Sequence, residues 1–235
     1  MKRFYTACSA VAVGLQWQVT LDGRNVRTQA AKPQLVPSRT LAEAMVGEWA
    51  AQAEEIDPGS FPLRDLADYA IDIVQPDPGK VADDLLRFAE TDTLCYRAEP
   101  DEALGIRQRD VWEPLILAAE ARLGVQFVRL AGVIHRPQPN DAIAALRAEM
   151  LRLDAFELAA LHTLASLAAS LIVGLAALDP AADAPALFDA SNLEEDWQAE
   201  LWGKDDDAIA LRARRLAGFC EAARFVNLAR ERGTN

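Results

Sequence analysis

The sequence predicts an α+β protein, in which a small mixed N-terminal domain precedes an all-helical C-terminal domain. Residues 17–28, WQVTLDGRNVRT, alternate apolar and polar side chains around an Asp-Gly turn, as β-hairpins do. The segment HRPQPN at 135–140 places two prolines within four residues, which discourages both helix and sheet. Beyond this break we find only helical spacing of apolar residues. We therefore predict a domain over residues 1–136 and an orthogonal helical bundle over residues 137–235.

Helices and short strands are predicted after the hairpin. Ser38 is a suitable N-cap for a helix that carries Leu41, Met45 and Trp49 on one side. Gly124 is well placed to end a later helix. The remaining N-terminal elements follow from their apolar patterns: a helix over residues 63–74, strands over 93–98 and 125–130, and a helix over 107–123 between those strands.

The C-terminal domain is predicted to contain helices over residues 141–152, 154–178, 192–202 and 207–231. Residues 158–178 hold no charged side chain, and this run is long enough to cross a bilayer. It is rich in alanine, however, with small polar residues such as Ser166, and it lacks an aromatic belt. We expect one buried helix of a soluble bundle and no membrane insertion. In that helix Ser166→Leu should overpack a close helix contact.

The charge of the chain is strongly acidic and unevenly distributed. The net charge of −12 argues against nucleic acid or an anionic membrane as a partner. Residues 183–207 carry nine acids and one lysine, whereas residues 208–235 carry six arginines and two glutamates. These two segments either neutralise each other in the fold or leave an acidic face for a partner.

The sequence offers no recognisable catalytic motif and no closed set of metal ligands. His135 and His162 are far apart in the chain, as are three cysteines in apolar surroundings. Phosphate-binding and dinucleotide-binding glycine motifs are missing. We therefore expect no cofactor, no metal and reduced thiols. The apolar N-terminus is similar to a signal peptide but continues into a strand pattern, so we expect a cytoplasmic protein.

Residues 191–207, SNLEEDWQAELWGKDDD, are the most unusual segment. Ser191 and Glu194 match a capping box that would begin a helix. Leu193, Trp197 and Leu201 would then form one apolar stripe that faces the core. Gly203 is predicted to end this helix, and Asp205 to Asp207 are predicted to cap the next one. The remaining acids would form an exposed face beside an aromatic residue. Three interpretations remain open: a docking face for a partner, a solvated helix surface, or a carboxylate-based and possibly metal-assisted hydrolase.

Several longer motifs occur in a characteristic order. They are RFY at 3–5, LDGRNVRT at 21–28, VPSRTLAEAMVGEW at 36–49, IDPGSFPLRDLADYAID at 56–72, TDTLCYRA at 91–98, WEPLI at 112–116, AFELAALH at 155–162 and LEEDWQAELWGKD at 193–205. In order and spacing the chain resembles the assembly chaperones of the ATP synthase catalytic head (F1-ATPase), the branch that escorts the α subunit. It departs from that family at Gln29, usually proline, and at Arg64-Asp65, usually Thr-Arg, on a helix turn expected to be exposed.

The resemblance implies a protein that is not an enzyme. Such a chaperone binds the free α subunit of the ATP synthase and shields its β-facing surface until the hexamer assembles. The residues that match the family's acidic C-terminal pattern, with Glu200 beside them, are the predicted partner-binding residues: Glu195, Gln198, Glu200, Trp202, Gly203 and Asp205. We expect a monomer in the bacterial cytoplasm, with eukaryotic relatives in the mitochondrial matrix. A helical adaptor for another client is the remaining alternative.

Overall fold

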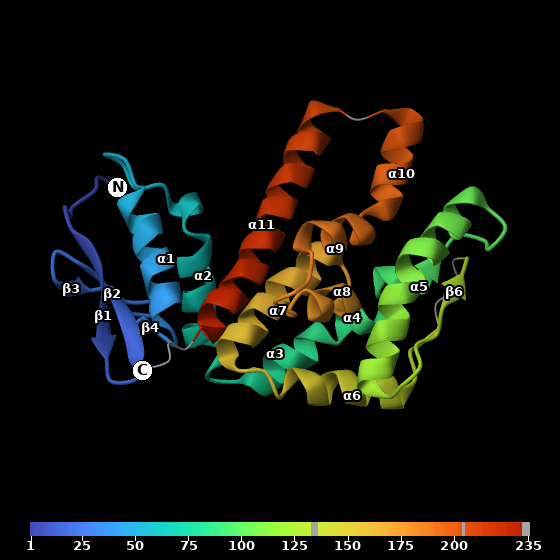
Figure 1. Cartoon of the computed structure of the whole chain (residues 1–235), viewed down its shortest axis with the longest axis horizontal. Helices are drawn as coiled ribbons and strands as arrows, with labels where there is room; N and C mark the ends of the chain where they lie inside the picture. The colour runs from blue at the N-terminus through green and yellow to red at the C-terminus, as the bar shows by residue number, and fades with distance from the viewer. Residues whose placement is uncertain (133–135, 204, 232–235) are drawn as a thin grey trace. The chain divides into compact units, whose positions relative to one another are not determined.

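The computed structural model describes residues 1–132, 136–203 and 205–231 (Figure 1). It divides into two compact units, described separately below: unit 1 comprises residues 1–78, 154–160 and 221–235, and unit 2 comprises residues 79–153 and 161–220. A small sheet near the N-terminus and a mostly helical remainder confirm the predicted α+β class. The predicted domain boundary between residues 136 and 137 stays a prediction.

Unit 1 is built on an antiparallel sheet whose central strand is β2, Gln16–Leu21. This strand pairs with β1 (Cys8–Val13), β3 (Arg24–Asn25) and β4 (Leu35–Val36). The predicted hairpin is confirmed: Asp22 and Gly23 have φ values of 48° and 77°, and such positive values at both turn positions match the twist of the strands. The sequence patterns did not predict β1, because its run of small apolar residues is similar to a signal peptide.

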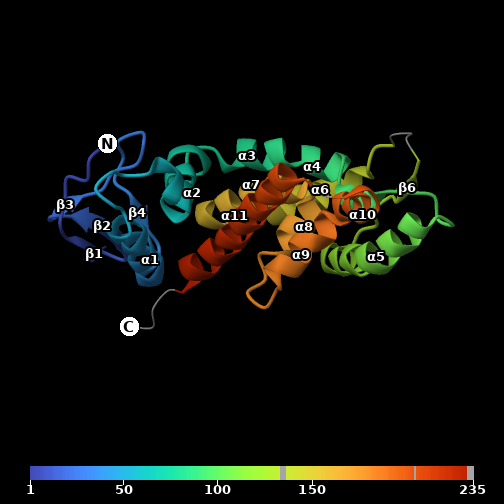
Figure 2. The ribbon, with the colours of Figure 1, turned by 90° about the horizontal axis from the view of Figure 1, so that it is seen from above.

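Helix α1, Arg39–Ala50, lies along this sheet, as Figure 2 shows. The predicted N-cap is confirmed, since the Ser38 hydroxyl accepts the N–H of Leu41 at 3.0 Å. Helix α2, Pro62–Tyr69, continues into a π-helical segment, Ala70–Val74. The Glu48 carboxylate caps α2 by accepting the N–H groups of its first residues at 2.6 and 3.0 Å, and burial raises the Glu48 pKa to about 7.

Of the two residues predicted to lie on an exposed helix turn, Asp65 is exposed, as predicted, but Arg64 is half-buried. Its side chain is only 17% exposed and pairs with Asp65 at 2.7 Å. The guanidinium lies 4.0 Å from the centre of the Phe61 ring. Arginine stacks well on aromatic faces because its planar charge is weakly hydrated. Arg64 therefore contributes to the packing of unit 1 through its contact with Phe61.

Most of the remaining helices belong to unit 2. They are α3 (Pro78–Leu85), α4 (Arg87–Glu90), α5 (Ala103–Leu123), α6 (Asn140–Met150), α7 (Ala155–Ala168), α8 (Leu171–Ala176), α9 (Ala184–Ser191), α10 (Leu193–Trp202) and α11 (Asp206–Arg230). Residues of α7 and α11 are divided between the two units. Gly124 ends α5 with a φ of 69°, as predicted.

The two strands predicted in this part are shorter than expected. They are β5, Tyr96–Arg97, and β6, Leu130–Ala131, which pair in parallel. A glutamine side chain takes the place of a neighbouring strand at Val128: the Gln138 amide accepts the Val128 N–H at 2.8 Å and donates to its carbonyl at 3.0 Å. A side chain that satisfies the backbone in this way leaves no ladder to extend.

The single helix predicted over residues 154–178 is two helices. The chain breaks between α7 and α8, where Ala169 has a φ of +47°. Ser170 caps α8 by accepting the N–H of Val173 at 3.0 Å. The break divides the long uncharged run, and no helix of the described residues is long and apolar enough to cross a membrane.

Ser166, where the prediction placed a close helix contact, is exposed. The close contact in this region lies at Gly174 instead. A Cβ atom at Gly174 would lie 3.0 Å from the Ala165 nitrogen and 3.1 Å from a Leu161 methyl group. The predicted overpacking by Ser166→Leu is therefore wrong. Gly174→Val should instead lower the free energy of unfolding by about 1–3 kcal/mol, measured by denaturant titration. Ser166→Val is the matched control and should change it by less than about 0.5 kcal/mol. Equal stability of the two variants would contradict this packing.

Candidate partner-binding site

The acidic segment forms α10 and the beginning of α11, which Figure 1 shows joined at one end. Gly203 ends α10, as predicted, with a φ of 89° and an N–H bonded to the Ala199 carbonyl. The Asp205 carboxylate caps α11 by accepting the N–H of Ala208 at 2.7 Å. Asp206 and Asp207 follow in the first turn, where a negative charge stabilises the helix dipole.

The start of α10 differs from the prediction. Ser191 belongs to the last turn of α9, where its hydroxyl donates to the Phe188 carbonyl at 2.8 Å. Asn192 is the N-cap of α10 and makes no capping bond through its side chain. Glu194 accepts a hydrogen bond from the buried Gln108 amide, and burial raises the pKa of this carboxyl. The predicted capping box is therefore wrong, because a longer-range partner occupies its glutamate.

The predicted apolar stripe of α10 is buried only at its beginning. Leu193 is buried and Trp197 is half-buried, whereas Leu201 is 63% exposed. Trp202 is 84% exposed, the most for any tryptophan here, and Ile209 at the start of α11 is also exposed. We call Leu201, Trp202 and Ile209 the apolar tip. Large apolar side chains that are exposed close together are a feature of protein interaction sites.

Several acids predicted to form a free face are paired with arginines. Glu200 accepts two hydrogen bonds from Arg107, at 2.7 and 3.0 Å. Glu195 lies 3.2 Å from Arg215. Asp196 and Asp189 both pair with Arg212, at 2.5 and 2.7 Å. The acidic segment and the basic helix thus neutralise each other in part.

These ion pairs contribute little to stability where they face solvent. Glu195 and Glu200 are 60% and 53% exposed, and surface pairs of this kind contribute roughly 0–1 kcal/mol. A partner that offers its own cation could replace the arginine at small cost. Asp205, Asp206 and Asp207 make no ion pair with a basic residue in the part of the chain that the structure describes.

The predicted partner-binding residues therefore fall into two groups. Trp202, Gly203 and Asp205 lie at the tip, where α10 passes into α11. The others, Glu195, Gln198 and Glu200, lie along exposed positions of α10. Sequence reasoning missed Leu201 and Ile209, which complete the apolar tip. The sequence held one signal for them: Leu201 and Ile209 lie on either side of the run Asp205–Asp207.

The histidines, cysteines and carboxylates that the structure describes are not gathered into a metal site. Within the described ranges no group of three or more His, Cys, Asp and Glu could hold a metal ion. Burial raises the pKa of the Cys95 thiol to about 12, which makes it a poor nucleophile. Burial also lowers the pKa of His162. His135 lies outside the described residues. No observation of the site favours the hydrolase interpretation.

Comparisons with known proteins identify a family. Residues 2–120 match the ATP12 chaperone protein family. The mitochondrial protein atp12 of Schizosaccharomyces pombe is 29% identical over 202 residues, which cover 81% of this chain and 69% of that protein. The crystal structure of Atp12 from Paracoccus denitrificans superposes with a TM-score of 0.90 at 40% identity and covers 97% of this chain and 98% of that one. A variant of the Paracoccus protein, with an aspartate replaced by lysine, matches equally well.

Proposed function

The chain belongs to the ATP12 chaperone family, assembly chaperones of the ATP synthase, and on that premise we propose that it binds the free α subunit of the catalytic head. Binding would cover the surface of the α subunit that later meets the β subunit, and so prevent aggregation before the hexamer forms. The proposed chaperone acts as a monomer in the bacterial cytoplasm.

The apolar tip is the observation that supports this proposal most directly. Trp202 is 84% exposed and lies close in sequence to three acids without arginine partners among the described residues. Tryptophan is enriched at the centres of protein interfaces, where its large ring excludes water. The adjacent negative charge favours a client surface that is apolar with a basic border.

Co-purification tests the choice of client. The tagged chain is co-expressed with the α and β subunits of the same ATP synthase. We expect the α subunit to co-purify, while the β subunit and the assembled hexamer do not. Recovery of both subunits in equal yield, or stable binding to the intact hexamer, would contradict the proposal.

Charge reversal on α10 tests the proposed surface. Glu195→Lys and Glu200→Lys should each weaken α-subunit binding by about 2 kcal/mol, roughly 30-fold, if the client contact excludes water. Their melting temperatures should stay near that of the wild type, because Glu195 and Glu200 are exposed and surface ion pairs of this kind contribute little to stability. Glu43→Lys on α1 is the control, since Glu43 also forms an exposed pair, with Arg39. Wild-type binding by both α10 variants would leave these two residues as a solvated helix surface.

A further inference from the structure

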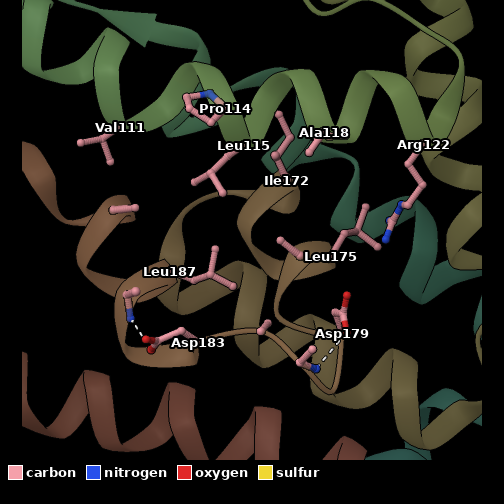
Figure 3. A pocket seen from close by; sticks show the side chains of 16 residues that line it. Val111, Pro114, Leu115, Ala118, Arg122, Ile172, Leu175, Asp179, Asp183 and Leu187 are labelled. Atoms are coloured by element: carbon pink, nitrogen blue, oxygen red, sulfur yellow. Dashed lines mark hydrogen bonds between the residues drawn. The ribbon is translucent and has the colours of Figure 1, made fainter.

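A second apolar surface of unit 2 lies in a groove of about 550 Å³ among α5, α8 and α9. Figure 3 shows Val111, Pro114 and Leu115 of α5 along one wall, with Leu187 of α9 facing them across the groove. Ile172 and Leu175 of α8 line it between these walls. Its volume falls in the range of roughly 300–1,000 Å³ that is typical of ligand-binding clefts.

The walls of the groove are held in place by buried hydrogen bonds. The indole N–H of Trp112, which is fully buried, donates to the carbonyl of Ala190 at 2.7 Å and joins α5 to α9. The backbone N–H of Ile172 donates to the buried carboxylate of Asp92 at 3.0 Å and fixes the start of α8. The space stays open because small side chains line α9, at Ala186 and Ala190. The groove is therefore preformed, and filling it requires little ordering of the protein.

Two carboxylates border the groove. Asp179 accepts the N–H of Ala181 at 2.9 Å, and Asp183 accepts the N–H of Ala186 at 3.1 Å. Both are exposed, and neither forms an ion pair with a basic side chain among the described residues. The basic residue of the lining, Arg122, lies 3.6 Å from Glu149 instead. The free charge of this border is negative, so it complements a cation.

We propose that this groove binds an apolar segment of the client that carries a lysine or arginine at its edge, with the basic side chain against Asp179 and Asp183. This inference rests on the proposed chaperone function and adds a second contact to it. The wall formed by α9 leads into α10 through Asn192 alone, so this wall is joined directly along the chain to the proposed partner-binding helix. An amphipathic client segment in an apolar groove is a recurring mode of recognition.

A matched pair of substitutions on α5 tests the groove. Val111 is 37% exposed and lines the groove, whereas Leu117 is 52% exposed on the same helix and lies outside the lining. Val111→Glu should weaken binding of the purified α subunit at least 10-fold, and Leu117→Glu should leave it unchanged. Ala118→Glu, at an exposed alanine of the lining, is the second variant if Val111→Glu melts early. Equal binding by wild type and both lining variants would overturn the proposal.

The charge at the border is tested separately. In the double variant Asp179→Asn and Asp183→Asn, the amide oxygens still accept the local N–H groups, and Asn remains a good helix cap. Binding should fall several-fold and lose part of its dependence on salt, because the client's cation has lost its counterion. Unchanged affinity and unchanged salt dependence would exclude a basic residue at this border.

A model peptide separates failure of this inference from failure of the proposed function. A labelled amphipathic peptide of leucine and lysine should bind the wild type and not Val111→Glu, whereas a leucine and glutamate peptide should bind neither. If the lysine peptide binds while the α subunit does not, the groove stands and the proposed client is wrong. If the α subunit binds and the lysine peptide does not, the groove inference is overturned. Self-association of the wild type that Val111→Glu abolishes would instead place a second copy of the chain in the groove.

Discussion

Asp92→Ala should lower the free energy of unfolding by about 3–5 kcal/mol at pH 5, because several buried N–H groups lose their acceptor. Asp92 is 1% exposed and accepts the N–H groups of Leu94 and Ile172 at 3.1 and 3.0 Å. These bonds join two segments about eighty residues apart, since the pair with Ile172 spans 80 positions. Each buried donor left without an acceptor costs roughly 1–3 kcal/mol. Chemical denaturation measures the loss.

The pH dependence of this loss has a definite sign. Burial raises the pKa of Asp92 to about 6, although N–H donors act against it. The folded wild type therefore holds a proton that the unfolded chain releases between about pH 4 and 6, so this group's stabilising contribution falls as the pH rises through that range. The destabilisation by Asp92→Ala should accordingly be smaller at pH 8 than at pH 5, by about 1 kcal/mol. Asp110→Ala, at an exposed aspartate, should cost less than about 0.5 kcal/mol at both pH values. If Asp92→Ala also lowered the free energy of unfolding by less than about 0.5 kcal/mol, its role as a buried acceptor would be contradicted.

The second large effect is expected at Trp112, in contrast to Trp202. Trp112 is fully buried and its indole N–H donates to Ala190, so Trp112→Ala should cost about 3–5 kcal/mol of stability. Any loss of α-subunit binding in this variant should accompany that loss of folded structure. Trp202 is 84% exposed, and Trp202→Ala should change stability by less than about 0.5 kcal/mol. Binding of the α subunit by Trp202→Ala should nevertheless fall by about 2 kcal/mol or more, as for an aromatic residue at the centre of an interface.

Melting curves and affinities of the same variants check both statements. A stable Trp112→Ala protein would contradict the packing of α5 on α9. A Trp202→Ala protein that binds as tightly as wild type would remove the apolar tip from the proposed interface. Trp197, predicted to face the core, is half-buried, and the Arg107 guanidinium lies 5.5 Å from its ring centre. Trp197→Ala should therefore destabilise the protein less than Trp112→Ala.

The sequence by itself determined the features that depend on neighbouring residues. The Asp22-Gly23 turn, the Ser38 cap and the helix ends at Gly124 and Gly203 are confirmed, because each depends on the backbone preference or side-chain reach of a few consecutive residues. The order and spacing of the longer motifs identified the family, and this step required no knowledge of which residues are in contact in the fold.

Only the tertiary structure decided the features that depend on distant partners. The predicted capping box at Ser191 fails because Gln108, 86 residues away, binds Glu194. The predicted acidic face is partly neutralised because Arg107 reaches Glu200 across 93 residues. Leu201 is exposed although its helical spacing matches that of a core residue, since spacing defines a side of the helix but not whether another element covers it. Which side chains of α10 remain available to a partner is therefore a property of the packed fold.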